Sequence, residues 1–163
     1  MSLVRPARAG DADDVWPLAR DFATSSRPRR DSFDETFAAL VDREDTLLAV
    51  AVAVAEGDRD GGVGGSDGRR GDVRGPAGAV AGYLLASTHL TFLANGSVCW
   101  VEEVMVAPPL RRSGVGAALM AYAEQWAHAR GAAYVSLASR RAGAFYAALG
   151  YDDSATFFRK DLG

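Results

Sequence analysis

The sequence predicts a single α/β domain, or equally an α+β domain, built on one mixed sheet. Its 163 residues are enough for one hydrophobic core but too few for two domains of ordinary size. Apolar residues recur with a strand period in some segments and with a helix period in others. The resulting order is strand, two helices, three strands, helix, strand, helix, strand, and we expect one domain over residues 1–163.

The N-terminal half contains the first two helices. Residues 3–6 are short and apolar, as in a strand, and Asp11 opens a helical pattern of apolar residues. A second helix is expected over residues 32–42, where large apolar side chains share one face. Residues 46–55 alternate bulky aliphatic residues with alanine, which predicts a strand with one bulky face, and residues 79–87 supply its partner.

Residues 56–78 separate these two strands and differ from both. They contain nine glycines and many charges, so they have little apolar surface to offset the entropy of ordering. We expect a disordered insertion in a hairpin, with a substrate lid as the alternative.

The third strand of this group is expected over residues 98–106, after the turn dipeptide Asn95-Gly96. Pro108 and Pro109 end it because neither can donate to a sheet ladder. Apolar residues at helical spacing then predict a helix over residues 114–130, closed by glycine.

The C-terminal part is expected to form a strand, a helix and a further strand. Residues 133–139 have the composition of a strand, and apolar residues from Ala142 to Leu149 mark a short helix that Gly150 closes. Residues 155–162 predict a last strand.

Charge and composition exclude several classes of function. A net charge of −3 argues against bulk electrostatic binding of nucleic acid. The single cysteine, Cys99, excludes an internal disulfide and suits a reducing compartment. No apolar run is long enough for a membrane span, so we expect a cytoplasmic protein with no membrane partner. His89 and His128 have no companions at ligand spacing, so no metal is expected.

Two glycines, Gly114 and Gly116, precede the predicted long helix. A helix start with free N–H groups binds negative charge, and glycine permits close approach of a ligand. A Walker loop is excluded because no Gly-Lys-Ser/Thr is present. A dinucleotide fingerprint fails because Leu119 replaces its third glycine. The remaining alternatives are another phosphate loop and a helix entry that binds nothing.

A wider pattern narrows this choice. The loop reads Val-x-Pro-x-x-Arg-x-x-Gly-x-Gly from Val106 to Gly116, and Phe145-Tyr146 is followed by Leu149-Gly150-Tyr151. Together these motifs resemble the GCN5-related N-acetyltransferase (GNAT) superfamily. The resemblance implies a central, mostly antiparallel, twisted sheet that is splayed between its fourth and fifth strands.

The resemblance also implies acetyl-CoA as the acetyl donor. Its pyrophosphate would bind the backbone N–H groups of Arg112, Ser113, Gly114, Val115, Gly116 and Ala117, with Arg111 and Arg112 supplying charge at the rim. Its pantetheine arm would pair with backbone at Val104, Met105 and Val106, beside a bulge. Ser139 stands where the family usually has an asparagine that contacts the coenzyme, and the alternative is that Arg140 or Arg141 reaches a phosphate.

Acetyl transfer to an amine needs a proton acceptor for the attacking nitrogen and a donor for the leaving thiolate. Strand neighbours point to opposite faces, so only one of Glu102 and Glu103 lines the cleft unless a bulge intervenes. We favour Glu102 as the base, with Glu103 second and water as the alternative. The family implies Tyr146 as the acid.

These residues predict direct attack in a ternary complex, since no nucleophile with a partner base is visible. The acceptor is expected to be a small, cationic, primary amine. Arg27, Arg29 and Arg30 form a solvated loop or, alternatively, recognise an anionic group of the acceptor. The alternatives to the enzyme are a catalytically silent acetyl-CoA sensor and an acyltransferase for longer acyl groups. A homodimer is a further expectation from the family.

Overall fold

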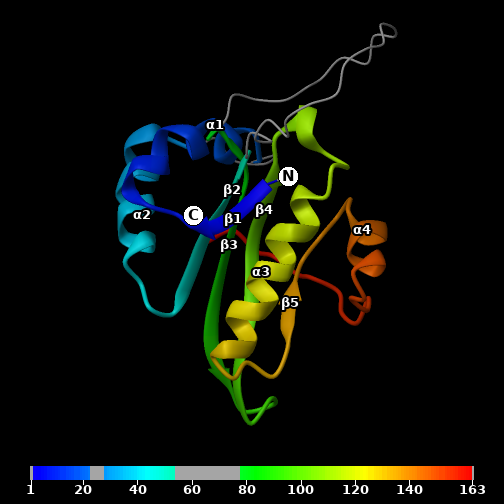
Figure 1. Ribbon diagram of the computed structural model, residues 1–163. Coiled ribbons are helices and arrows are strands. Elements are labelled where there is room, and N and C mark those ends of the chain that lie inside the picture. The colour runs from blue at the N-terminus through cyan, green and yellow to red at the C-terminus, as the bar shows by residue number, and fades with distance from the viewer. Residues whose placement is uncertain (1, 23–27, 54–77, 163) are drawn as a thin grey trace, which may run out of the picture.

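The computed structural model describes residues 2–22, 28–53 and 78–162 (Figure 1). The α-helices of the described residues are α1 Ala12–Phe22, α2 Arg30–Val41, α3 Val115–Ala129 and α4 Gly143–Ala148. The strands are β1 Ser2–Pro6, β2 Thr46–Ala53, β3 Val80–Thr91, β4 Gly96–Val106 and β5 Val135–Leu137. Apart from Gly78, the insertion expected over residues 56–78 lies outside the described residues.

The five strands form one mixed sheet in the order β1-β2-β3-β4-β5. The first four pair antiparallel, and β5 runs parallel to β4. The predicted mixed, mostly antiparallel sheet is therefore confirmed. A short turn joins β3 to β4, β1 reaches β2 through α1 and α2, and the parallel step requires the crossover through α3.

Helices cover the sheet on two sides, with α1 and α2 on one face and α3 on the other (Figure 1). The alternation in β2 explains this arrangement. Leu48 and Val50 pack with α1 and α2, whereas Ala49 and Ala51 pack against α3. The small alanine side chains let α3 lie close to the sheet.

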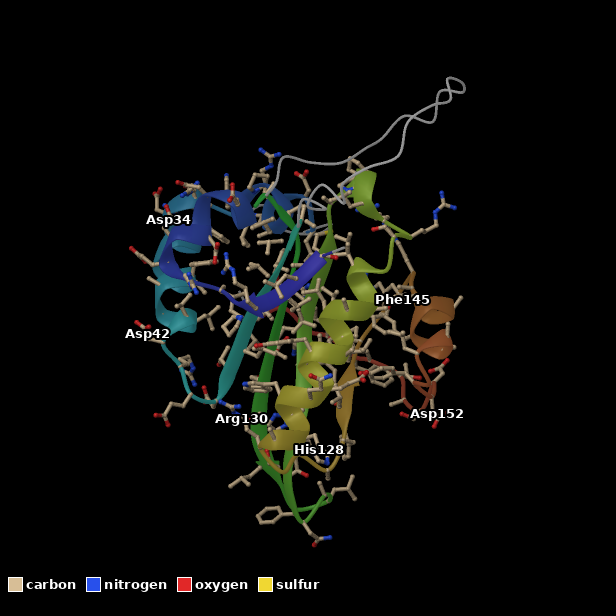
Figure 2. All side chains as sticks on the ribbon, in the orientation of Figure 1. Asp34, Asp42, His128, Arg130, Phe145 and Asp152 are labelled. Atoms are coloured by element: carbon tan, nitrogen blue, oxygen red, sulfur yellow. The ribbon has the colours of Figure 1, made fainter. Side chains whose placement is uncertain are left out.

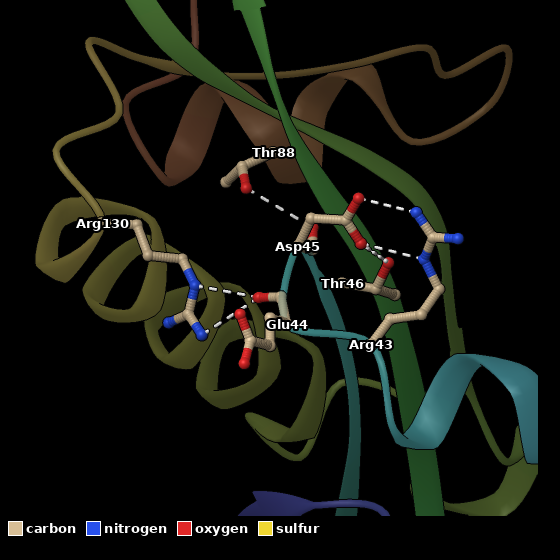
Figure 3. A network of polar contacts seen from close by, with 6 residues as sticks. All are labelled: Arg43, Glu44, Asp45, Thr46, Thr88 and Arg130. Atoms are coloured by element: carbon tan, nitrogen blue, oxygen red, sulfur yellow. Dashed lines mark hydrogen bonds and ion pairs between the residues drawn. The ribbon is translucent and has the colours of Figure 1, made fainter.

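The α2–β2 turn is tied to the C-terminal end of α3 by polar contacts (Figure 3). Two guanidinium nitrogens of Arg130 donate to the Glu44 carbonyl oxygen, at 3.3 and 3.2 Å. In the same turn, Arg43 forms a two-point ion pair with Asp45, and the Thr88 hydroxyl donates to the Asp45 carbonyl oxygen at 3.4 Å. The turn thereby joins β2, β3 and α3.

Strands β4 and β5 stay together for only a short distance. Their pairing covers three residues of β4, Cys99, Trp100 and Val101, and each pairs with one residue of β5. Strand β4 continues to Val106, while the chain after Leu137 leaves toward α4 (Figure 1). The splay between the fourth and fifth strands is thus present, and it leaves one edge of β4 without a strand neighbour in the described chain.

The last predicted strand, residues 155–162, is wrong. Residues 151–162 belong to no strand, and Phe158 is 87% exposed. Phe157 lies against the Trp100 ring, with 6.4 Å between centroids. A strand exists only where a neighbour accepts and donates its hydrogen bonds, and the outer edge of β5 pairs with nothing in the described part of the chain. The apolar pattern alone predicted a strand without that partner.

Candidate active site

A cavity of about 730 Å³ lies between the helices α1 and α2 and the sheet, and it extends to the start of α4. Its apolar walls come from both helices and from β2 and β3, including Val15, Phe33, Phe37, Leu48 and Leu85. Its polar lining includes the predicted catalytic residues and three residues expected near the coenzyme. These are Glu102, Glu103 and Tyr146, and Ser139, Arg140 and Arg141. The cavity therefore gathers residues from distant segments of the chain.

A β-bulge at Glu102 places both acidic residues of β4 on this cavity. Leu85 pairs with Glu103 and Ala86 with Val101, so Glu102 has no partner in β3. One extra residue shifts the alternation of side chains along a strand. As a result Val101 packs toward α3, whereas Met105 packs toward α1 and α2. A bulge was the condition for both acids to line the cleft. The bulge is present, and both Glu102 and Glu103 line the cavity.

The two acids have different surroundings. The Glu103 side chain is half-buried and accepts a hydrogen bond from the Tyr83 hydroxyl, with 2.5 Å between the two oxygens. Tyr83 is itself only 2% exposed, and burial together with the negative charge of Glu103 raises the pKa of its phenol far above the usual range. Glu102, at the bulge, is exposed to solvent. Glu103 is thus held in place, and Glu102 is in contact with water.

The open edge of β4 presents backbone groups from alternate residues. The Met105 carbonyl faces Gly82 of β3, and the Ala107 N–H donates to the Ala81 carbonyl at 2.9 Å. Neighbouring residues of a strand direct their backbone groups to opposite edges, so those of Val104 and Val106 face away from β3. The Val106 carbonyl oxygen accepts a hydrogen bond of 3.2 Å from Arg111. Of the three positions expected to pair with pantetheine, Val104 and Val106 have the suitable direction, and Met105 does not.

The glycine loop lies between β4 and α3, apart from the residues that line the cavity. Arg112 and Gly114 both have a positive φ, 63° and 87°, which turns the chain sharply into the helix. The Ser113 hydroxyl donates to the Leu110 carbonyl at 2.6 Å and fixes the turn. Arg111 and Arg112 are exposed, whereas the side chain of Val115, the first residue of α3, is buried in the core between α3 and the sheet.

The first turn of α3 provides free backbone donors. The Ala118 N–H makes the first helical hydrogen bond, to the Gly114 carbonyl at 3.0 Å. The N–H groups of Val115, Gly116 and Ala117 precede it, so they have no partner within the helix. Such donors at a helix N-terminus bind phosphate groups well. The loop therefore has the chemistry expected of a pyrophosphate site.

Tyr146 enters the cavity from α4 and is half-buried. Burial raises the pKa of its phenol above the usual value, so the hydroxyl stays protonated at neutral pH. The Tyr146 ring contacts Phe145 and Tyr151, and the Tyr151 hydroxyl donates to Glu124 of α3 at 2.8 Å. These contacts attach the short helix α4 to α3 and fix the position of Tyr146.

The segment before α4 orients that helix. The Ala142 N–H donates to the Ser139 hydroxyl oxygen at 3.1 Å, so Ser139 supports the turn that leads into α4. Arg140 and Arg141 are exposed and line the cavity beside it. They provide positive charge at the end of the cavity nearest α4.

Two other candidates, Cys99 and Arg30, do not line the cavity. Cys99 is fully buried, and burial raises the pKa of its thiol to about 11, as suits a core residue. Arg30 is engaged by Asp13 and Asp34 and lies over the Trp16 ring, which joins α1 to α2. Arg29 lines the cavity, and Arg27 lies outside the described residues.

Among the cavity residues that sequence reasoning missed are Tyr83 and Arg159. Tyr83 is the single aromatic residue of β3, and that isolation among small and aliphatic residues was the available signal. Arg159 lies in the segment predicted as a strand, so it was not considered for the cavity.

No group of three or more potential metal-ligating side chains occurs in the part of the chain that the structure describes. Within residues 2–22, 28–53 and 78–162, no helix combines the length and the apolar character needed to cross a membrane.

Comparison with known protein families and sequences gives matches to acetyltransferases. The family model for the acetyltransferase (GNAT) family matches residues 12–151. Streptothricin acetyltransferase from Streptomyces lavendulae is 33% identical over 138 residues, which cover 82% of this chain and 70% of that protein.

Solved structures with similar folds include two acetyltransferases. Glucosamine-6-phosphate N-acetyltransferase from Arabidopsis thaliana has a TM-score of 0.76 at 16% identity and covers 100% of this chain and 99% of its own. An aminoglycoside antibiotic 6'-N-acetyltransferase from Acinetobacter baumannii has a TM-score of 0.68 at 17% identity and covers 100% of both chains. At these identities the structural likeness shows the fold alone.

Proposed function

The chain belongs to the GNAT family of acetyltransferases, and we propose that it transfers an acetyl group from acetyl-CoA to a primary amine of a small, cationic acceptor. The observation that carries this proposal is the meeting of Glu102, Glu103 and Tyr146 in one cavity beside the open edge of β4. A base, an anion and a phenolic donor around one reaction centre suit attack by an amine on a thioester.

The donor fits the residues around the splay. Backbone N–H groups of residues 115–117 and the charges of Arg111 and Arg112 would hold the pyrophosphate. Backbone groups of Val104 and Val106 would pair with the pantetheine arm, which requires Arg111 to release the Val106 carbonyl. Ser139 would lie near the pantetheine arm, and Arg141 would reach a phosphate. The bound coenzyme supplies a thioester carbonyl that an amine can attack.

The attacking amine reaches the site as an ammonium ion and must lose a proton first. We assign this step to Glu102, because an exposed carboxylate can pass the proton on to water. The protonated hydroxyl of Tyr146 would donate a hydrogen bond to the sulfur as the thiolate leaves. Attack is direct, in a ternary complex, because the buried Cys99 is unsuited as an acyl carrier.

The acceptor class follows from charge. Two carboxylates on the β4 side of the cavity favour a cationic amine. The relatives whose names mention streptothricin, aminoglycosides and glucosamine-6-phosphate support a small amine as the general class. Cytoplasmic location and a homodimer remain predictions.

Thiol release from acetyl-CoA, measured with a panel of small amines, tests the function. We expect at least one cationic amine to raise thiol release above background. We expect Glu102→Gln to lower kcat by about two orders of magnitude while coenzyme A binding is preserved. Thiol release that stays at background with every amine, together with tight coenzyme binding, would favour the silent sensor instead. Faster release from a longer acyl-CoA would favour an acyltransferase for longer acyl groups.

A further inference from the structure

Tyr83 is a buried polar residue to which the proposed reaction assigns no role. Its side chain lies on the face of the sheet toward α1 and α2, and its hydroxyl meets the Glu103 carboxylate at 2.5 Å. That distance is typical of a hydrogen bond from a neutral hydroxyl to an ionised carboxylate. Tyr83 is 2% exposed and therefore has little freedom to move. One oxygen of Glu103 is thus occupied and the carboxylate is fixed.

The bulge makes this pair relevant to the acceptor. Because it brings Glu102 and Glu103 to the same cavity, two acids serve one reaction that needs only one proton removed from the amine. Glu102 has access to water, whereas Glu103 is half-buried and already holds a hydrogen bond. A fixed anion is suited to binding a cation that keeps its charge throughout the reaction. The attacked nitrogen does not keep its charge, because it must be neutral when it attacks.

We propose that Tyr83 is a positioning residue which holds Glu103 as the binding site for a second cationic group of the acceptor. The acceptor is then at least a dication, with one ammonium near Glu102 and another at Glu103. This inference rests on the proposed function for the location of the acceptor. Four arginines also line the cavity: Arg29 and Arg159 are each paired with an aspartate, Asp31 and Asp161, and Arg140 and Arg141 lie at the end nearest α4.

The test compares pentylamine with its α,ω-diamine, cadaverine, and with spermidine. Steady-state kinetics measure kcat and KM separately, and calorimetry measures binding of each amine to the protein saturated with coenzyme A. The variants are Tyr83→Phe and Glu103→Gln. Tyr134→Phe is the matched control, since it also removes a phenol but lies outside the cavity lining and is 46% exposed.

We expect the wild type to prefer a dicationic amine over pentylamine by at least about tenfold in kcat/KM and in affinity. Tyr83→Phe and Glu103→Gln should remove most of this preference by raising KM for the dications more than KM for pentylamine. The melting temperature of each variant separates this effect from general loss of structure. Tyr134→Phe should change neither the preference for dications nor the melting temperature.

Two results would overturn the inference. One is that the wild type shows no preference for dications in either kcat/KM or affinity. This includes the case in which no amine binds. The other is a pair of variants that lose kcat and keep the preference. If amines bind with the expected preference but no thiol is released, the proposed function fails while the assignment of Glu103 stands.

Discussion

The ring of Phe145 in α4 lies directly over Gly116 in the first turn of α3. A Cβ added to Gly116 would be 3.2 Å from the Phe145 Cζ atom, which is closer than ordinary van der Waals contact. Figure 2 shows Phe145 between the two helices. Gly116 therefore joins the glycine loop to the helix that carries Tyr146, in addition to its expected place beside the coenzyme.

Substitution Gly116→Ala should disturb the site more than the fold. Alanine is the better helix former by about 1 kcal/mol, which offsets part of the cost of moving the ring. We expect a melting temperature close to that of the wild type and a lower kcat, because Phe145 shifts α4 and with it Tyr146. Adding Phe145→Leu to this variant should restore part of the lost kcat. A double variant no more active than Gly116→Ala would contradict the coupling.

Gly82→Ala should destabilise the fold. The new Cβ would lie 2.6 Å from the Met105 carbonyl oxygen, so β3 and β4 must separate locally. We expect a loss of about 2 kcal/mol in the free energy of unfolding. Denaturant titration measures this, with Gly10→Ala as the control because no atom lies within 4 Å of its added Cβ. Equal losses in both variants would rule out the close approach as the cause.

The Arg5–Asp11 pair should make stability fall in acid. Arg5 donates two hydrogen bonds of 2.7 Å to Asp11, and the Arg8 N–H donates a third, which together hold the pKa of Asp11 below its usual value. Because the pKa is lower in the folded state, the stabilisation is present above the unfolded pKa, near 4, and is lost as the pH falls below it.

Asp11→Asn should therefore cost about 1.5 kcal/mol at pH 7, and the difference from the wild type should shrink below about pH 4. Unfolding titrations across this pH range measure it. The exposed Arg43–Asp45 pair provides the comparison, and Asp45→Asn should have the smaller effect. A difference that grows in acid would contradict the assignment.

Tyr146→Phe should affect turnover and not coenzyme binding. The hydroxyl is the group that would meet the leaving sulfur, and burial keeps its pKa above the usual value, so it remains a donor throughout the neutral range. We expect kcat to fall by about one to two orders of magnitude. Isothermal calorimetry with coenzyme A should give unchanged affinity. Tyr122→Phe is the matched control, because it also removes a phenol hydroxyl but lies on α3, outside the cavity lining.

Cys99 should be unreactive in the folded protein. Its thiol is fully buried, and burial raises its pKa to about 11, so only about one thiolate in a thousand exists at pH 8. A thiol reagent should modify it only after unfolding, which is followed by absorbance with and without denaturant. Rapid modification of the native protein would place the side chain outside the core.

The spacing of apolar residues, together with turn residues and composition, was sufficient to predict helices α1 to α4 and strands β1 to β5. It was sufficient because period and turn residues are local properties of the chain. The same kind of pattern failed for residues 155–162, where no neighbouring strand accepts the hydrogen bonds. Apolar alternation reports that a segment can form a strand, and the pairing partner decides whether it does.

By itself the sequence determined the mixed sheet, the glycine loop at the start of α3 and the family, since these depend on residue types at fixed spacings. The tertiary structure decided which groups face the cavity. The bulge that brings Glu102 and Glu103 together arises from the register of β4 against β3, and the hydrogen bond from Tyr83 joins residues twenty positions apart. Both are relations between strands, and no local pattern encodes the register of one strand on another.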